Sequence, residues 1–216
     1  MRKFVLCVAG AAALALSQAS NAAIVIGTNV AGTNPYSGPA PTFTFDTLAG
    51  TPSFTGGAVV SGTSASHAQP FGSTGSYYSV GLNDGTTGVI DLSSFADISS
   101  ISLLWGSIDT YNTLQFLDSA NNVLATFGGS TIINPAVGNQ SDPSTNRVVT
   151  FLLTGTDVTA FSRLRLTSNS NAFEIDNLAI NPIVVPEPVS WVLMLLGFCG
   201  LGLSIRRHRS GLPQVA

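Results

Sequence analysis

The C-terminal segment constrains this chain most, because it joins a helix-breaking tripeptide to a long apolar run. Pro186 and Pro188 flank Glu187. Proline lacks a backbone donor, and it pushes the residue before it toward an extended conformation. The mostly apolar stretch 189–205 follows, and as a helix it would rise about 25 Å, near the lower limit for crossing a bilayer. The segment therefore predicts an extended, protease-accessible tripeptide directly ahead of a short transmembrane helix.

A basic cluster follows the apolar stretch. Arg206, Arg207 and Arg209 would hold the tail 210–216 in the cytoplasm, since positive charge favours the inner side of the membrane. With the Pro-Glu-Pro tripeptide, Trp191 and the glycines of the membrane segment, this order of features resembles the PEP-CTERM sorting signal of bacterial exosortase substrates.

The resemblance implies a route through the cell envelope. Residues 186–209 would form the sorting segment, and the helix would hold the exported precursor in the inner membrane. An exosortase would then cleave near the tripeptide, and the protein would reach the cell surface or the extracellular polysaccharide matrix of a Gram-negative bacterium. The expected partners are thus the exosortase, the membrane before processing, and exopolysaccharide.

The N-terminus has the composition of a secretory signal. Basic residues at positions 2 and 3 precede an apolar run over 4–16, and the Ser-Asn-Ala sequence at 20–22 fits the small-x-small rule for cleavage. We therefore expect a signal peptide over 1–22. A lipoprotein signal is disfavoured, because Cys7 lies inside the apolar run rather than at its end.

The segment between these ends, residues 23–185, is acidic. The whole chain carries a net charge of −3, but the only cations of this segment are Arg147, Arg163 and Arg165. An acidic surface without a basic cluster argues against a nucleic-acid ligand.

The positions of the cysteines and the length of the chain predict one domain without disulfide bonds. Cys7 and Cys199 both lie in the expected targeting segments, so residues 23–185 contain neither a disulfide nor a thiol nucleophile. This length suffices for one domain with its own core. We expect no cofactor and no metal.

The pattern of residues 23–185 predicts an all-β fold. Short apolar or β-branched runs alternate with turn sequences, and no long window shows a helical period. This predicts an antiparallel β-sandwich of jelly-roll type, with long surface loops at 27–41 and 49–76. The expected strands cover residues 24–26, 42–45, 77–82, 88–92, 98–105, 111–117, 123–127, 147–153, 162–167 and 173–180.

The last two expected strands suggest a hairpin over 162–180. Arg163 and Arg165 alternate with leucines, and Glu174 and Asp176 alternate with apolar residues. Pairing of the two strands would set arginines against carboxylates on an exposed face. The alternative is a calcium site built on the two carboxylates, since calcium prefers oxygen ligands.

Catalytic motifs are nearly absent. After processing His67 is the only histidine left, and it lies in a Ser/Ala/Gln/Pro-rich loop. No Gly-x-Ser-x-Gly sequence frames a serine nucleophile. A general base must be held in position, so the pattern favours a loop histidine and a protein that is not an enzyme.

Residues 105–112 form the most distinctive internal segment. It is expected to connect two strands, and it carries Trp105, Asp109, Tyr111 and Asn112. Such side chains suit a small polar ligand such as a sugar. The alternative is that the two aromatic residues belong to the hydrophobic core.

Two functions of different classes follow. The first is a non-enzymatic surface or matrix protein associated with exopolysaccharide or biofilm. The second is a carbohydrate-binding module that recognises the exopolysaccharide, with the 105–112 segment as its candidate site.

Overall fold

The computed structural model describes residues 22–47, 52–183, 193–199 and 201. The chain divides into two compact units, Met1–Pro182 and Ile183–Ala216. In the second unit, residues 193–199 and 201 are helical. Across the described parts of the chain, no helix is both long and apolar enough to span a bilayer.

Several predicted features fall outside the described residues. They are nearly all of the signal peptide 1–22, the tripeptide Pro186, Glu187 and Pro188, and the arginines Arg206, Arg207 and Arg209. These features remain predictions from the sequence.

The first unit is built from strands and two four-residue helices. The described elements are β1 (Ala23–Ala31), β2 (Ser53–Gly56), β3 (Ala58–Ser61), β4 (Ser76–Val80), β5 (Thr87–Asp91), β6 (Ile98–Gly106), β7 (Asn112–Asp118), β8 (Val123–Gly128), α1 (Gly129–Ile132), β9 (Arg147–Thr154), α2 (Asp157–Ala160), β10 (Phe161–Ser168) and β11 (Phe173–Pro182).

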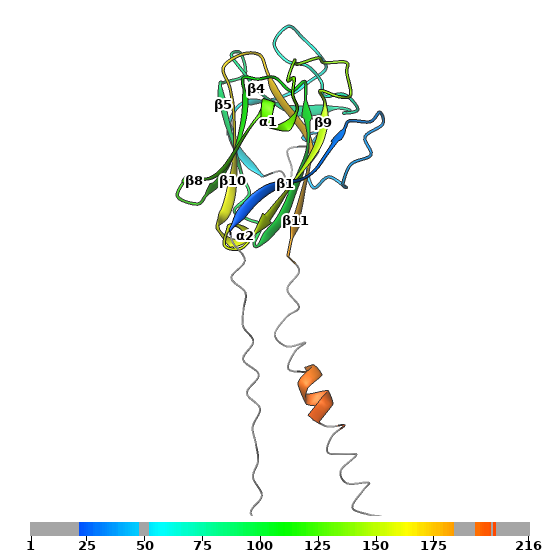
Figure 1. Cartoon of the computed structure of the whole chain (residues 1–216). Helices are drawn as coiled ribbons and strands as arrows, with labels where there is room; N and C mark the ends of the chain where they lie inside the picture. Colours follow the sequence, from blue (N-terminus) through cyan, green and yellow to red (C-terminus); the bar gives the residue numbers. More distant parts are fainter. Residues whose placement is uncertain (1–21, 48–51, 184–192, 200, 202–216) are drawn as a thin grey trace, which may run out of the picture. The chain divides into compact units, whose positions relative to one another are not determined.

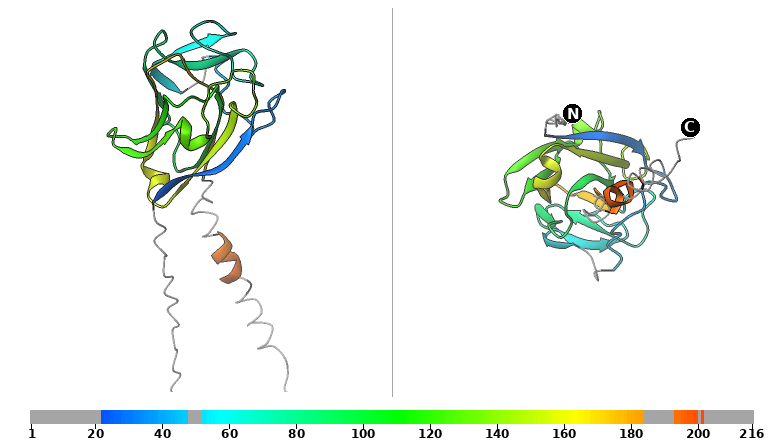
Figure 2. Two further views of the ribbon diagram at one scale, coloured as in Figure 1. Left: turned by 45° about the horizontal axis from the view of Figure 1, so that its top comes forward. Right: turned by 90° about the horizontal axis from the view of Figure 1, so that it is seen from below.

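The strands form two antiparallel sheets, which confirms the predicted all-β class. One sheet has the order β1-β9-β6-β11-β4-β3, and the other has the order β2-β5-β10-β7-β8. In Figure 1, β5, β8 and β10 lie on one side of this unit and β9 and β11 on the other. The right-hand view of Figure 2 places β1 (blue) and the cyan strands at opposite sides, in line with β1 and β3 being edge strands.

The inner faces of the two sheets share one hydrophobic core. Phe116 of β7 lies at its centre, with its ring centroid 5.1 Å from that of Phe151 in the opposite sheet and 5.1 Å from that of Phe161. Trp105 and Phe173 stack at 4.3 Å near the end of β6. Side chains of this size dominate the energetics of burial, because each removes a large apolar area from water.

Most predicted strands match the structure to within two residues, with two errors and one omission. The first strand runs to Ala31, so residues 27–31 of the predicted loop 27–41 belong to β1, which pairs with β9. Residues 42–45 form only an isolated bridge between Phe43 and Leu178. Phe45 has φ +60°, a left-handed conformation that an extended strand cannot accommodate, so the pairing stops there. The predicted loop 49–76 contains β2 and β3, whose short, glycine-flanked sequences gave little strand signal.

The predicted hairpin over 162–180 is wrong. Strand β10 pairs with β5 and β7 in one sheet, while β11 pairs with β4 and β6 in the other. Arg163 donates to Asp91 at 3.1 Å, and Arg165 donates to the Gln115 side chain at 2.8 Å. The arginines therefore never meet Glu174 or Asp176, because the chain crosses between the sheets after β10.

Glu174 and Asp176 are buried rather than exposed. Each side chain is about 1% exposed, because residues 62–75 lie over the outer face of β11 and β6. The Ala68 N–H donates to Glu174 at 2.8 Å. Pro70 packs directly on Gly106, where an added Cβ would lie 2.8 Å from the proline ring.

Burial removes both carboxylates from water and raises their pKa values. The pKa of Glu174 rises from the usual 4.5 to about 7, and the pKa of Asp176 rises from 3.8 to about 7. Desolvation, which disfavours the charged form, is the largest cause for both groups. The folded protein therefore binds protons more tightly than the unfolded chain between about pH 4 and pH 7.

This difference predicts that the protein is more stable at mildly acidic than at alkaline pH. Below their unfolded pKa values both groups are protonated in either state and the stabilisation is fully present; it is lost as the pH rises through about 7. One pKa unit corresponds to about 1.4 kcal/mol. We expect Tm to be at least about 5 °C lower at pH 8 than at pH 5.

Calorimetry on the full chain and on the double variant E174Q/D176N measures the effect. The double variant has no carboxylate to ionise at these positions, so its Tm should change little over the same pH range. An equally steep pH dependence in both proteins would contradict the assignment to these two groups.

Candidate functional site

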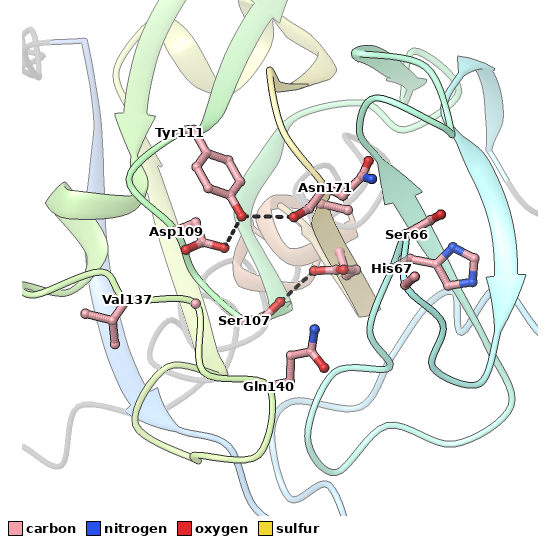
Figure 3. Close-up of a pocket in the computed structure, with 12 residues that line it drawn as sticks. Ser66, His67, Ser107, Asp109, Tyr111, Val137, Gln140 and Asn171 are labelled. Atoms are coloured by element: carbon pink, nitrogen blue, oxygen red, sulfur yellow. Dashed lines mark hydrogen bonds between the residues drawn. The ribbon is translucent and has the colours of Figure 1, made fainter.

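A polar pocket lies at the end of the sheets where β6 finishes and β7 begins. Its volume is about 270 Å³, and its lining comes from residues 65–67, the loop 107–111, residues 137–140 and residues 171–174. Figure 3 shows Asp109 and Tyr111 on one side of this pocket, and Ser66 and His67 on the other. Four segments that are distant in sequence therefore meet at one site.

Asn146 holds three of these segments together. Its side chain is fully buried, and its Oδ1 accepts hydrogen bonds from the backbone N–H groups of Phe71 and Ser107, both at 3.0 Å. Its Nδ2 donates to the carbonyl oxygens of Asn139 at 3.1 Å and Asp142 at 3.0 Å. The Asn146 amide thus joins three segments: the covering loop (residues 62–75, which lie over β11 and β6), the β6–β7 loop and the segment before β9.

Glu174 contributes a buried carboxylate to the pocket lining. As the second residue of β11 it faces away from the core, toward the covering loop. Its Oε1 accepts from Ala68 N, and its Oε2 accepts from Ser107 Oγ, both at 2.8 Å. These two bonds lower the pKa of Glu174, but burial outweighs them and leaves it near 7.

Tyr111 and Asp109 form a short hydrogen-bonded pair on the β6–β7 loop. The Tyr111 hydroxyl lies 2.5 Å from Asp109 Oδ2 and 2.9 Å from the carbonyl oxygen of Asn171. The hydroxyl has one hydrogen to donate, so it shares this hydrogen between the Asp109 carboxylate and the Asn171 carbonyl oxygen. Burial raises the pKa of Asp109, and the hydrogen bond from Tyr111 opposes this rise.

Gly138 leaves the space that the Asp109 carboxylate occupies. Val137 pairs with Asp109 in an isolated β-bridge, and Gly138 has φ +64°. An added Cβ at this position would lie 2.2 Å from Asp109 Oδ1. Glycine is therefore required here both for its backbone conformation and for the close approach of the acid.

His67 lies in the covering loop and is more enclosed than a loop histidine need be. Its side chain is 16% exposed, and its Nδ1 lies 3.4 Å from Asp84 Oδ2. Asp84 in turn accepts a hydrogen bond from Ser79 Oγ at 2.6 Å, and the rings of His67 and Tyr77 meet edge to face at 6.1 Å. Among the described residues, His67 Nδ1 makes no hydrogen bond.

The structure places two of the four candidate residues of the 105–112 segment in the pocket lining and buries the other two. Asp109 and Tyr111 line the pocket. Trp105 is fully buried and stacks on Phe173 in the core, as the alternative interpretation of this residue expected. Asn112 is also fully buried, where it accepts from Ser168 Oγ at 3.2 Å.

Sequence reasoning missed most of the pocket. Glu174 alternates with apolar residues, and an exposed acid gives the same pattern, so periodicity did not separate the two environments. Gln140 and Asn171 lie in turns, where amide residues are common for local reasons. Nothing in the spacing of these residues indicated that they share a site.

Substitution of Gly138 tests the packing of Asp109, with Gly62 as the matched control. Gly62 has φ +68°, and nothing lies within 4 Å of an added Cβ. Gly62→Ala should therefore cost only the left-handed strain of about 1–2 kcal/mol. Gly138→Ala should cost at least about 1 kcal/mol more, because it also displaces Asp109.

Urea unfolding of the two variants measures this difference. Adding Asp109→Ala to Gly138→Ala should recover part of the loss, since the two side chains compete for one space. Equal costs for the two glycine substitutions, with no recovery, would contradict the packing account.

The chemistry of the pocket is that of polar recognition. Carboxyl, phenol, imidazole, amide and hydroxyl groups converge on a space that a small polar molecule can fill. Within the described residues, no group of three or more His, Cys, Asp or Glu side chains gathers as metal ligands.

No protein-family model matches the chain, and no curated protein shows significant sequence similarity to it.

Proposed function

We propose that this chain is an exported cell-surface or extracellular-matrix protein of a Gram-negative bacterium, sorted and processed by an exosortase. The observation that carries the proposal is the order of features at its C-terminus: Pro186-Glu187-Pro188, the apolar stretch 189–205 and the arginines that follow. The expected signal peptide 1–22 supports export. Residues 193–199 are helical and fall within the proposed membrane segment.

For the exported part we propose a jelly roll that serves a non-enzymatic role in the exopolysaccharide matrix or biofilm. Strands β9-β6-β11-β4 are adjacent in one sheet and β5-β10-β7-β8 in the other. Along the chain these strands alternate between the sheets, apart from the β7–β8 hairpin. This order supports a jelly roll, whose eight strands form two sheets; β1, β2 and β3 would be additions at the edges.

The second candidate function is a carbohydrate-binding module, and the polar pocket favours it. Jelly-roll folds occur in lectin domains, but a fold by itself does not establish an activity. The stronger support is local: Asp109, Tyr111, Gln140 and Asn171 line one pocket. Their groups can donate to and accept from sugar hydroxyls.

Replacement of Pro186-Glu187-Pro188 by three alanines tests the sorting proposal. Alanine favours helix, so the membrane helix can extend outward through the processing site, and the variant should stay in the inner membrane with its tail intact. Mass spectrometry of the C-terminus in the native host gives the readout. The matched control is Leu212-Pro213-Gln214 replaced by three alanines, which should be processed normally.

The C-terminus of the mature wild-type protein tests the sorting proposal directly. Its mature C-terminus should lie near Pro186, without the arginine cluster. Recovery of wild-type protein that still ends in the intact 206–216 tail would refute the sorting proposal.

A pull-down with the exopolysaccharide of the native host tests the carbohydrate-binding candidate. Tyr111→Ala removes a pocket phenol and should reduce retention at least about tenfold. Tyr36→Ala removes a tyrosine outside the pocket lining and should leave retention unchanged. Equal retention of both variants would assign any binding to another surface.

A further inference from the structure

The pocket contains acids without a fixed cation. Glu174 and Asp109 both line it, and neither lysine nor arginine belongs to its lining. In the described parts of the chain the only arginines are Arg147, Arg163 and Arg165. Each is engaged away from the pocket, on Asn29, Asp91 and Gln115 respectively. The ionised form of Glu174 therefore has no counter-charge from an arginine or lysine of the described chain.

The Glu174 carboxylate can accept a further hydrogen bond from a molecule that enters the pocket. An ionised carboxylate offers about four lone-pair positions. Ala68 N and Ser107 Oγ occupy two of them, and the backbone N–H of Glu174 also bonds to its own carboxylate. The side chain is about 1% exposed, yet it belongs to the pocket lining. Buried charges in proteins are normally paired, so a cationic group entering this pocket would complete the pairing.

The remaining lining limits what that cationic molecule can be. Half of the other lining residues carry an amide or a hydroxyl group, among them Asn171, Gln140 and Ser66, while Ala65, Ala172 and Val137 are the only purely aliphatic side chains of the lining. A lysine side chain or a lipid amine would bring a hydrocarbon chain with little apolar wall to cover it. A molecule with hydroxyl groups around an ammonium group fits this lining better.

The size of the pocket fits one small ring. Its volume of about 270 Å³ is just below the range of about 300–1,000 Å³ typical of small-molecule sites. A uronic acid would place its own carboxylate beside that of Glu174, and a neutral sugar would leave an ionised Glu174 without a counter-charge.

We propose that this pocket binds a single hexose-sized sugar unit that carries a free amino group, with the Glu174 carboxylate as the counter-charge of the ammonium group. The inference rests on the carbohydrate-binding candidate function and gives it a substrate class. Asn171, Gln140 and Ser66 would hydrogen-bond the ring hydroxyls, and Tyr111 with Asp109 would form the opposite wall.

Nuclear magnetic resonance titration with matched monosaccharides tests the proposal. The full-length chain is kept in a detergent without a sugar headgroup. The panel contains the amine, acetamide and hydroxyl forms at C2 of glucose, galactose and mannose, so that only charge and bulk change within each series. In at least one series the amine form should bind at least about tenfold more tightly than the other two.

Two variants distinguish charge recognition from a structural effect. Glu174→Gln keeps the shape, and its side-chain oxygen can still accept from Ala68 N while Ser107 Oγ accepts from its amide, so the variant should fold and lose the amine preference. Asp176→Asn removes the other buried acid of β11, which lies outside the pocket lining, and should keep the preference.

The other outcomes distinguish the amino-sugar assignment from the carbohydrate-binding function on which it rests. Equal binding of all three forms would overturn the amine assignment and leave carbohydrate binding in place. Absence of binding by every sugar would overturn both. Saturation of the same resonances by calcium alone would replace the sugar with a metal cation.

Discussion

The structure depends on the burial of both faces of β6 and β11 at one end of the six-stranded sheet. One face of each strand packs on the core that the two sheets share, and residues 62–75 cover the other face. Polar side chains of that outer face, Glu174 and Asp176 among them, are thereby removed from water. Hydrogen-bond donors such as Ala68 N and Ser107 Oγ for Glu174, and Asn177 N for Asp176, satisfy them, because a buried polar group without a partner is costly.

The same requirement explains how the loops around the pocket are held. Asn146 uses both ends of its amide to bond backbone groups of three segments. Strands position these segments, but a buried hydrogen-bond network fixes them relative to one another. The pocket consequently combines loop residues with Glu174 of β11 on a rigid support, and loops on such a support are the usual place for binding sites.

The proposed export route and the pocket belong to different parts of the chain. The proposed sorting features are local and linear, because a protease and a membrane would each recognise a short continuous segment. The proposed recognition of an amino sugar requires groups from four separated segments, with Glu174 supplying the charge. Processing at the C-terminus would therefore leave the groups of the pocket unchanged.

The sequence by itself determined the all-β class and most strand positions, because alternating burial imposes a period of two on each strand. It also carries the proposed targeting features, which lie in short continuous segments of the chain. It did not decide which sheet each strand joins. Leu164 with Leu166 and Phe173 with Ile175 alternate in the same way, yet β10 and β11 lie in opposite sheets.

Only the tertiary structure decided the environment of the acids and the composition of the pocket. Glu174 has the pattern of an exposed residue, and its burial follows from a loop more than a hundred positions earlier in the chain, whose Ala68 N–H donates to it. The aromatic residues of the 105–112 segment show the same limit, since Trp105 packs in the core while Tyr111 lines the pocket. A local pattern records which face of a strand a residue occupies, whereas what covers that face depends on contacts between distant segments.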